Sequence, residues 1–109
     1  MTKDKNFYKR VGKCLGLTFT EKQLNYLMGN FTIWKRQEGF TTAHIIKKLF
    51  SGGIITFSTS IDEPKTWSHR RDYLKTLYKY YLVLCETPFQ KYLSNIDPDL
   101  MEFLKDLTN

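Results

Sequence analysis

The stretch of sequence that decides the fold is PKTWSHRRDYLKTLYKYYLVLCETPFQKYLS, residues 64–94. Its first half predicts a helix from Pro64 to about Tyr80, because apolar and aromatic residues recur on one side and cations fall largely elsewhere. The residues on the apolar side are Trp67, Leu74, Leu77, Tyr78 and Tyr81. This half therefore presents a basic surface on a helix.

The second half decides between two folds. Residues 80–85 are aromatic and β-branched enough for a strand, and residues 89–94 alternate loosely after the break at Glu86-Thr87-Pro88. Two short strands around a tight break make a hairpin, which is the interpretation we favour. The alternative extends the helix to Cys85 and makes the protein an all-α bundle, since a short apolar run fits either period.

Upstream, residues 41–57 predict another helix and a strand. Thr41 or Thr42 is a suitable cap for a helix whose apolar face is formed by Ile45, Ile46 and Leu49. Gly52-Gly53 stops this helix, and the β-branched and aromatic run from Ile54 to Phe57 predicts a short strand.

Three further helices complete the prediction. Residues 4–15 carry apolar residues at helical spacing and end at Gly16. Thr20 and Gln23 form a capping-box pattern, and the apolar face that follows predicts a helix that continues to Gly39. Asp97 and Pro98 begin a C-terminal helix, residues 97–108.

Helix, helix, helix and hairpin is the order of a winged helix-turn-helix domain. The stretch TTAHIIKKL, residues 41–49, resembles the first helix of that motif, WSHRRDYLKTL, residues 67–77, is similar to its recognition helix, and YYLVLC, residues 80–85, looks like the first wing strand. The length of 109 residues allows one domain, 1–109. The resemblance implies that this domain is mainly α with a small β-hairpin, with a winged-helix core at about 18–95 and extra N- and C-terminal helices. It also implies a recognition helix in the major groove of DNA.

The candidate nucleic-acid-binding residues lie mainly on the predicted recognition helix. Arg side chains fork onto guanine edges, and Lys side chains suit phosphates. The set is Arg70, Arg71, His69, Ser68, Lys75, Lys65 and Lys79, with Lys47 and Lys48 from the preceding helix. Two tyrosines, Tyr73 and Tyr80, are free to be exposed, whereas most other aromatics are expected to fill the core.

Charge divides the chain into a basic body and an acidic end. The 109 residues carry a net charge of +6, but residues 95–109 hold four carboxylates against Lys105, so the first 94 residues carry +9. We therefore expect an anionic partner. The resemblance implies a small non-catalytic protein of regulation or replication that binds DNA rather than RNA, and the richness in Lys, Asn, Ile, Tyr and Phe indicates a phage or mobile-element origin. The N-terminal cations from Lys3 to Lys13 form either a basic arm or a solvated helix face.

The C-terminal stripe is the candidate protein-binding surface. Its apolar residues are Leu100, Phe103, Leu104 and Leu107. Three alternatives remain open from the sequence: these residues pack on the same chain, pair with a second copy, or dock on a partner protein. The acidic Glu86 at the predicted wing tip and the aromatic excess support an alternative function, a protein-binding adaptor.

Other classes of function have weaker signals. No His, Cys and Asp spacing resembles a zinc site, and Ser51-Gly52-Gly53 is too short for a phosphate loop, so we expect no metal, no cofactor and no catalysis. No apolar run reaches the roughly 18 residues of a membrane span. The charged N-terminus and the two unaccompanied cysteines suit a cytoplasmic protein without a signal peptide.

Overall fold

The computed structural model describes residues 3–35, 39–56 and 67–108. In chain order these residues form α1 (Lys5–Cys14), α2 (Glu21–Leu27), α3 (Phe40–Leu49), β1 (Ile54–Ile55), α4 (Trp67–Cys85), the 3-10 helix η1 (Pro88–Tyr92), β2 (Asn95–Ile96) and α5 (Pro98–Thr108). The expectation of a mainly α protein is confirmed. Within the described residues, no helix is long and apolar enough to cross a membrane.

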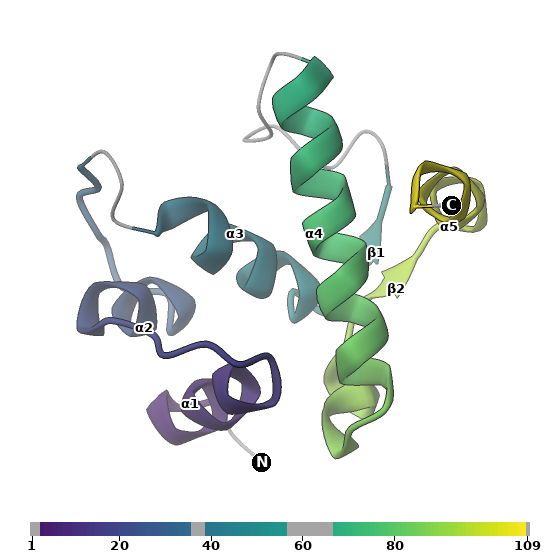
Figure 1. Cartoon of the computed structure of the whole chain (residues 1–109). Helices are drawn as coiled ribbons and strands as arrows, with labels where there is room; N and C mark the ends of the chain where they lie inside the picture. Colours follow the sequence, from purple (N-terminus) through teal and green to yellow (C-terminus); the bar gives the residue numbers. More distant parts are fainter. Residues whose placement is uncertain (1–2, 36–38, 57–66, 109) are drawn as a thin grey trace.

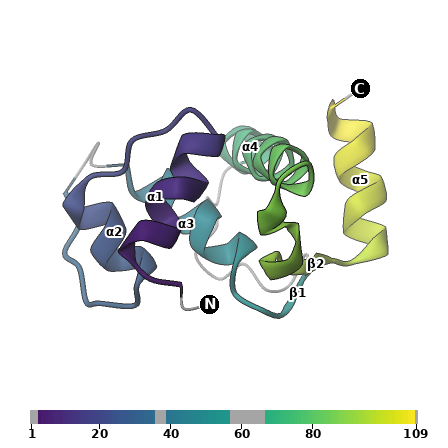
Figure 2. The ribbon, with the colours of Figure 1, turned by 90° about the horizontal axis from the view of Figure 1, so that it is seen from below.

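The 19-residue helix α4 is the central element of the fold. It packs against α3 on one side and α5 on the other, and it also contacts α1 and η1. Figure 2 looks along α4 and shows α1, α2 and α3 on one side of it, with α5 on the opposite side. The predicted basic helix is therefore the element against which α1, α3, α5 and η1 pack.

The predicted hairpin is wrong, because residues 80–85 are the last turns of α4. Leu77 and Leu84, which are two helical turns apart, are both fully buried. Leu82 and Val83 lie on the opposite side and are 47% and 37% exposed. In a strand, Leu82 and Leu84 would face the same side. Residues 80–85 are therefore buried with the helical period, which is set by packing against neighbouring helices. This packing decides between helix and strand, a choice that the short apolar run left open.

The break at residues 86–88 ends α4 instead of turning a hairpin. The backbone N–H groups of Glu86 and Thr87 donate to Val83 and Leu84 carbonyls at 3.1 Å, which tightens the last turn. The Thr87 hydroxyl then accepts a hydrogen bond from the Phe89 N–H at 3.1 Å, and a proline opens η1. The second predicted wing strand, residues 89–94, is thus mostly 3-10 helix.

The strand predicted at residues 54–57 is present at 54–55, and Phe57 lies outside the described residues. The strand pairs in parallel with β2, so that Ile54 lies opposite Asn95 and Ile55 opposite Ile96. The pairing joins the segment after α3 to the segment before α5, and the two strands lie beside the middle of α4 in Figure 1.

Buried Ser94 fixes this pairing to the end of α3. Its N–H donates to the Leu49 carbonyl at 2.7 Å, and its hydroxyl accepts from the Gly52 N–H at 2.9 Å. The Ser51 hydroxyl lies 3.0 Å from the same oxygen. A buried hydroxyl with several partners satisfies backbone groups that would otherwise lack hydrogen bonds.

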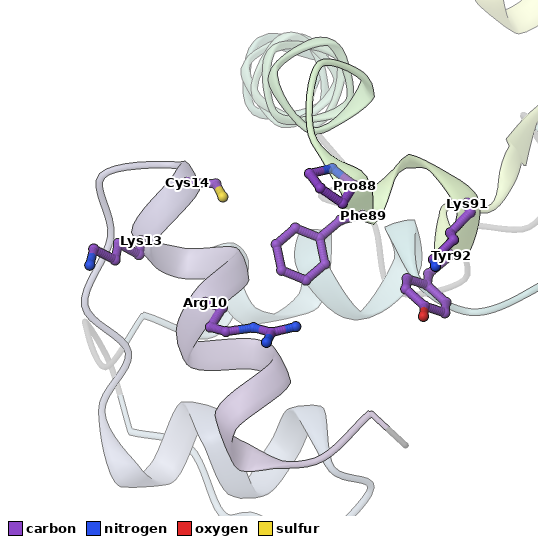
Figure 3. Close-up of a pocket in the computed structure, with 7 residues that line it drawn as sticks. All are labelled: Arg10, Lys13, Cys14, Pro88, Phe89, Lys91 and Tyr92. Atoms are coloured by element: carbon purple, nitrogen blue, oxygen red, sulfur yellow. The ribbon is translucent and has the colours of Figure 1, made fainter. Parts of the chain in front are cut away.

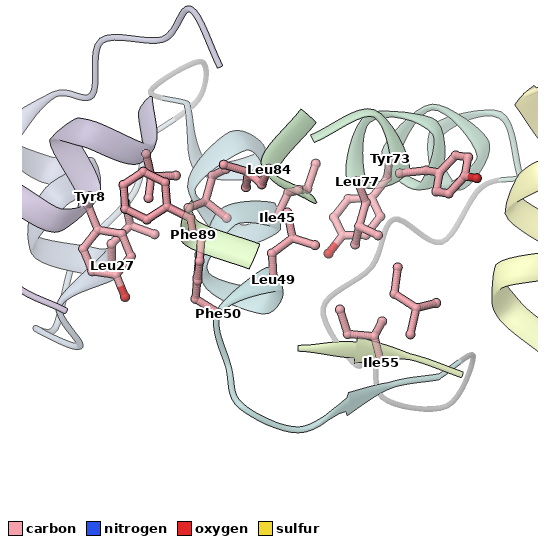
Figure 4. Packing of buried hydrophobic residues seen from close by; sticks show 14 of the residues in the cluster. Tyr8, Leu27, Ile45, Leu49, Phe50, Ile55, Tyr73, Leu77, Leu84 and Phe89 are labelled. Atoms are coloured by element: carbon pink, nitrogen blue, oxygen red, sulfur yellow. The ribbon is translucent and has the colours of Figure 1, made fainter. Parts of the chain in front are cut away.

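One hydrophobic core joins all the helices. Figure 4 shows it as a continuous layer, from Tyr8 and Leu27 at one end to Tyr73 and Ile55 at the other. The apolar face predicted for α3 is confirmed, since Ile45, Ile46 and Leu49 are buried in this layer. Tyr73 is 3% exposed, so the prediction that it is free to be exposed is wrong.

Helix α2 has its predicted start and a different end. Thr20 and Gln23 form the capping box, with N···O distances of 3.1 and 2.9 Å. The helix stops at Leu27, since Gly29 adopts a φ of +90° and the Asn30 N–H reaches back to the Asn25 carbonyl at 2.9 Å. This is a Schellman cap, so the expected continuation to Gly39 is wrong.

Gly39 begins the next helix, where we expected Thr41 or Thr42 to be the cap. Its φ is +80°, and its carbonyl accepts hydrogen bonds from the Ala43 N–H and from the Gln23 amide at 2.9 Å. One side chain therefore caps α2 and also fixes the first turn of α3.

The C-terminal helix α5 is confirmed, with the Asp97 carboxylate accepting from the N–H groups of its first turn. Leu100 and Leu104 are 1% and 0% exposed, and Phe103 and Leu107 pack half-buried against the same core. The structure therefore places the predicted partner-binding stripe on the body of its own chain, where two of its four side chains are inaccessible.

Candidate functional site

The outer face of α4 carries a row of three cations, Arg71, Lys75 and Lys79, which we call the basic ridge. They are spaced four residues apart, so they project from one side of the helix, about 6 Å from each other along its axis. All three are exposed, whereas Tyr73, Leu77 and Leu84 on the opposite side of the helix are buried. The three cations form no ion pair or hydrogen bond within the described part of the chain.

The other predicted residues of this helix fall outside the ridge. His69 and Arg70 are exposed and lie in the first turns of α4, but the helical period turns them away from the ridge. Lys65 and the side chain of Ser68 lie outside the described residues. The predicted cluster is thus divided, with the ridge as its continuous part.

Lys47 and Lys48 do not extend the ridge. The Lys47 ammonium donates to the Tyr26 carbonyl at 3.2 Å and lies 4.4 Å from the centre of the Tyr26 ring. The Lys48 ammonium lies 5.9 Å from the centre of the Tyr73 ring. Both are half-buried and bridge α3 to its neighbouring helices. These cations contribute to packing between helices, a role that charge alone did not indicate.

An open cavity of about 520 Å³ lies between the first turn of α3 and α4. Its polar lining includes Thr41, Thr42, His69, Asp72, Thr76 and Tyr80. Beside it, the Tyr73 hydroxyl and His44 Nδ1 are hydrogen-bonded at 2.9 Å. Burial raises the pKa of the Tyr80 phenol, so this group stays protonated at neutral pH. The cavity offers hydroxyl groups and an imidazole together with one carboxylate, and the carboxylate makes it poorly suited to an anion.

The second cationic surface is a groove of about 630 Å³ between α1 and η1, which we call the α1–η1 groove (Figure 3). Its lining consists of Arg10, Lys13, Cys14, Pro88, Phe89, Lys91 and Tyr92. Three of these seven described residues are cations and none is a carboxylate. The groove is therefore an apolar depression with positively charged edges.

Aromatic packing fixes the floor of this groove. The buried Phe7 ring of α1 meets the Phe89 and Tyr92 rings edge-on, at centroid distances of 5.2 and 5.5 Å. The Arg10 guanidinium lies 5.6 Å from the centre of the Phe89 ring, and the Lys91 ammonium lies 5.2 Å from that of Tyr92. These contacts hold α1 and η1 together and place cations over the rings.

Sequence reasoning missed this groove because its two walls are more than 70 residues apart in the chain. The N-terminal cations were recognised as a cluster, but the segment 88–92 was assigned to a hairpin. The available signal was the helical spacing of Phe7 and Arg10, which places a core residue and a cation one turn apart.

Comparison with known proteins identifies no relative: no protein-family model, no curated protein and no solved structure matches the chain. In the part of the chain that the structure describes, no three His, Cys, Asp or Glu side chains come together as a metal site. Function is therefore argued from the geometry of the two cationic surfaces.

Proposed function

We propose that this protein binds nucleic acid, with DNA as its ligand and without catalysing a reaction, through the basic ridge of α4. The observation that carries the proposal is the row of three exposed cations at four-residue spacing on one helix face, which form no ion pair with any described residue. A row of this kind matches a row of phosphates, whose contacts supply most of the affinity in sequence-independent binding.

The ridge is also unfavourable in the isolated protein, which supports a function for it. Like charges four residues apart on a helix repel each other, at a cost of about 0.2–0.5 kcal/mol per pair, which the exposed Asp72, three residues before Lys75, offsets in part. Arg71 lies near the helix N-terminus, where positive charge opposes the helix dipole. A polyanion along the ridge relieves both penalties.

In this proposal, α4 alone contacts the nucleic acid. The described residues contain no wing, so of the winged helix-turn-helix resemblance we retain only the order of three helices with a basic third one. Lys75 and Lys79 contact phosphates in this arrangement, and Arg71 reaches either a phosphate or a guanine edge. The N-terminal turns of α4 extend past α3 in Figure 1.

The test is binding of a labelled duplex of about 20 base pairs, two helical turns, and of a single strand of equal length, by fluorescence anisotropy at low salt. The ridge variant is Lys75→Gln/Lys79→Gln, and the off-ridge control, Lys9→Gln/Lys105→Gln, removes the same charge from two exposed positions elsewhere. We expect the ridge variant to bind several-fold more weakly than the control. Equal binding by the two variants, or no binding by the wild type, would refute the proposal.

A further inference from the structure

The α1–η1 groove has the features of a binding site that the ridge does not explain. Its volume of about 630 Å³ lies in the range of ligand pockets, and its edges carry Arg10, Lys13 and Lys91, all exposed. The described lining contains three cations and no carboxylate. An occupant that combines negative charge with an apolar group would match this lining.

Aromatic exposure favours a peptide over a nucleic acid as that occupant. Single-stranded nucleic acids bind by stacking bases on exposed aromatic faces. Phe89 is only 7% exposed, and the Tyr92 ring already has the Lys91 ammonium 5.2 Å from its centre. The floor thus offers apolar edges for a side chain and little free ring face for a base.

The floor is preorganised for such a side chain. The edge-on packing of Phe7 against Phe89 and Tyr92 ties both walls of the groove to the core, so the depression exists before a ligand enters. A preformed site avoids part of the ordering cost of binding. In Figure 3, Arg10 and Cys14 face the groove from α1, opposite Phe89 and Tyr92, so one apolar side chain between the walls places its neighbouring residues beside the cations.

We infer that the α1–η1 groove binds an acidic peptide segment of a partner protein, with a bulky apolar side chain on the floor and carboxylates beside Arg10 and Lys91. Charge complementarity is the basis for this choice of partner. The inference is independent of nucleic-acid binding, because the groove shares no residue with the basic ridge.

The experiment begins with selection of binders to the wild-type protein from a random dodecapeptide library displayed on phage. We expect enriched sequences with net negative charge and at least one large apolar residue. One enriched peptide is then synthesised with a fluorophore and titrated by anisotropy. The groove variant, Arg10→Glu/Lys91→Glu, should bind it about tenfold more weakly or worse, because two favourable ion pairs become repulsive. The ridge variant should bind it as the wild type does.

Cys14 supplies a direct measure of occupancy. It is exposed in the groove, and the second cysteine, Cys85, is replaced by serine in this assay. The peptide should slow maleimide labelling of Cys14, and unfolding midpoints show that the groove variant is folded. Three results would overturn the inference: no enrichment, equal binding by the groove variant, or protection of Cys14 by an oligothymidylate and not by the peptide. The last of these results would assign the groove to nucleic acid. Loss of nucleic-acid binding at the ridge, without any of the three results, would leave the inference about the groove intact.

Discussion

Replacement of Leu82 and Leu84, one at a time, by alanine tests the helical conformation of residues 80–85. Leu84 is fully buried in the core, and Leu82 is 47% exposed, although the two are separated by a single residue. In a helix, neighbours two apart point in different directions, whereas in a strand they share a face. The helix therefore predicts very different costs for the two substitutions, and a hairpin predicts similar ones.

The magnitudes follow from burial. Truncation of a fully buried leucine removes apolar contacts and leaves a cavity, at a cost of about 2–5 kcal/mol in free energy of unfolding. Leu82 loses about half of a transfer free energy of roughly 1.5–3 kcal/mol, and the higher helix propensity of alanine offsets part of that loss. We expect a cost of about 1 kcal/mol or less for Leu82→Ala.

Urea unfolding followed by far-ultraviolet circular dichroism measures both values. With a slope of roughly 1.5 kcal/mol per molar, Leu84→Ala should lower the midpoint by at least about 1.3 M and Leu82→Ala by less than about 0.7 M. If Leu84→Ala fails to fold, Leu84→Met supplies the value at a cost below about 1.5 kcal/mol, and Leu82→Met serves as its control. Equal shifts for the two positions, or a larger one at Leu82, would contradict the helix.

Three further predictions concern the ridge, a backbone position and a buried phenol. If the ridge contacts three phosphates of a duplex, the slope of log affinity against log salt should be about −2.7 for the wild type and about −0.9 for the ridge variant. Between roughly 50 and 200 mM salt, the affinity of the wild type should then fall about 40-fold and that of the ridge variant about 3.5-fold. Equal slopes would refute the assignment. Gly39→Ala should destabilise the protein more than Gly52→Ala, as measured by urea unfolding, because both have positive φ but only at Gly39 would a Cβ collide with the Gln23 amide. Burial raises the pKa of Tyr8, so above about pH 10 the unfolded chain ionises first and stability falls as pH rises; Tyr8→Phe should make this fall shallower in unfolding curves at several pH values, and an unchanged slope would contradict it.

Local signals in the sequence predicted the parts of the fold that local chemistry decides. The Thr20–Gln23 capping box, the Gly16 terminator and the Asp97 cap all involve neighbours within about one turn, and all are present. The predicted end of α2 was wrong because both Gly29 and Gly39 could end the helix, and the apolar residues after Gly29 continued the helical period. Of these, Phe31 is 91% exposed, so the period there did not reflect burial.

Long-range contacts determine the features that the sequence did not predict. Residues 80–85 are apolar on most sides, so their conformation depends on which side chains the neighbouring helices cover. The parallel pairing of Ile55 with Ile96 joins residues 41 positions apart, and no local pattern encodes it. The candidate site divides in the same way: helical spacing alone places Lys75 and Lys79 on one face, whereas the groove requires that α1 and η1 meet.

The two proposed surfaces lie on different parts of the molecule, and their separation has a consequence for function. The groove wall η1 follows Cys85 at the last turn of α4, about 9 Å from Lys79 and about 21 Å from Arg71 along the helix axis. The shorter distance is close to the screening length of about 8 Å at physiological salt and the longer one is well beyond it, so a phosphate on the ridge affects a carboxylate in the groove only weakly. A nucleic acid and an acidic peptide should therefore bind together, each with an affinity little changed by the other. Such independence is what a small protein needs in order to hold a protein partner on a nucleic acid, and mutual exclusion in a two-ligand titration would mean that both ligands compete for one surface.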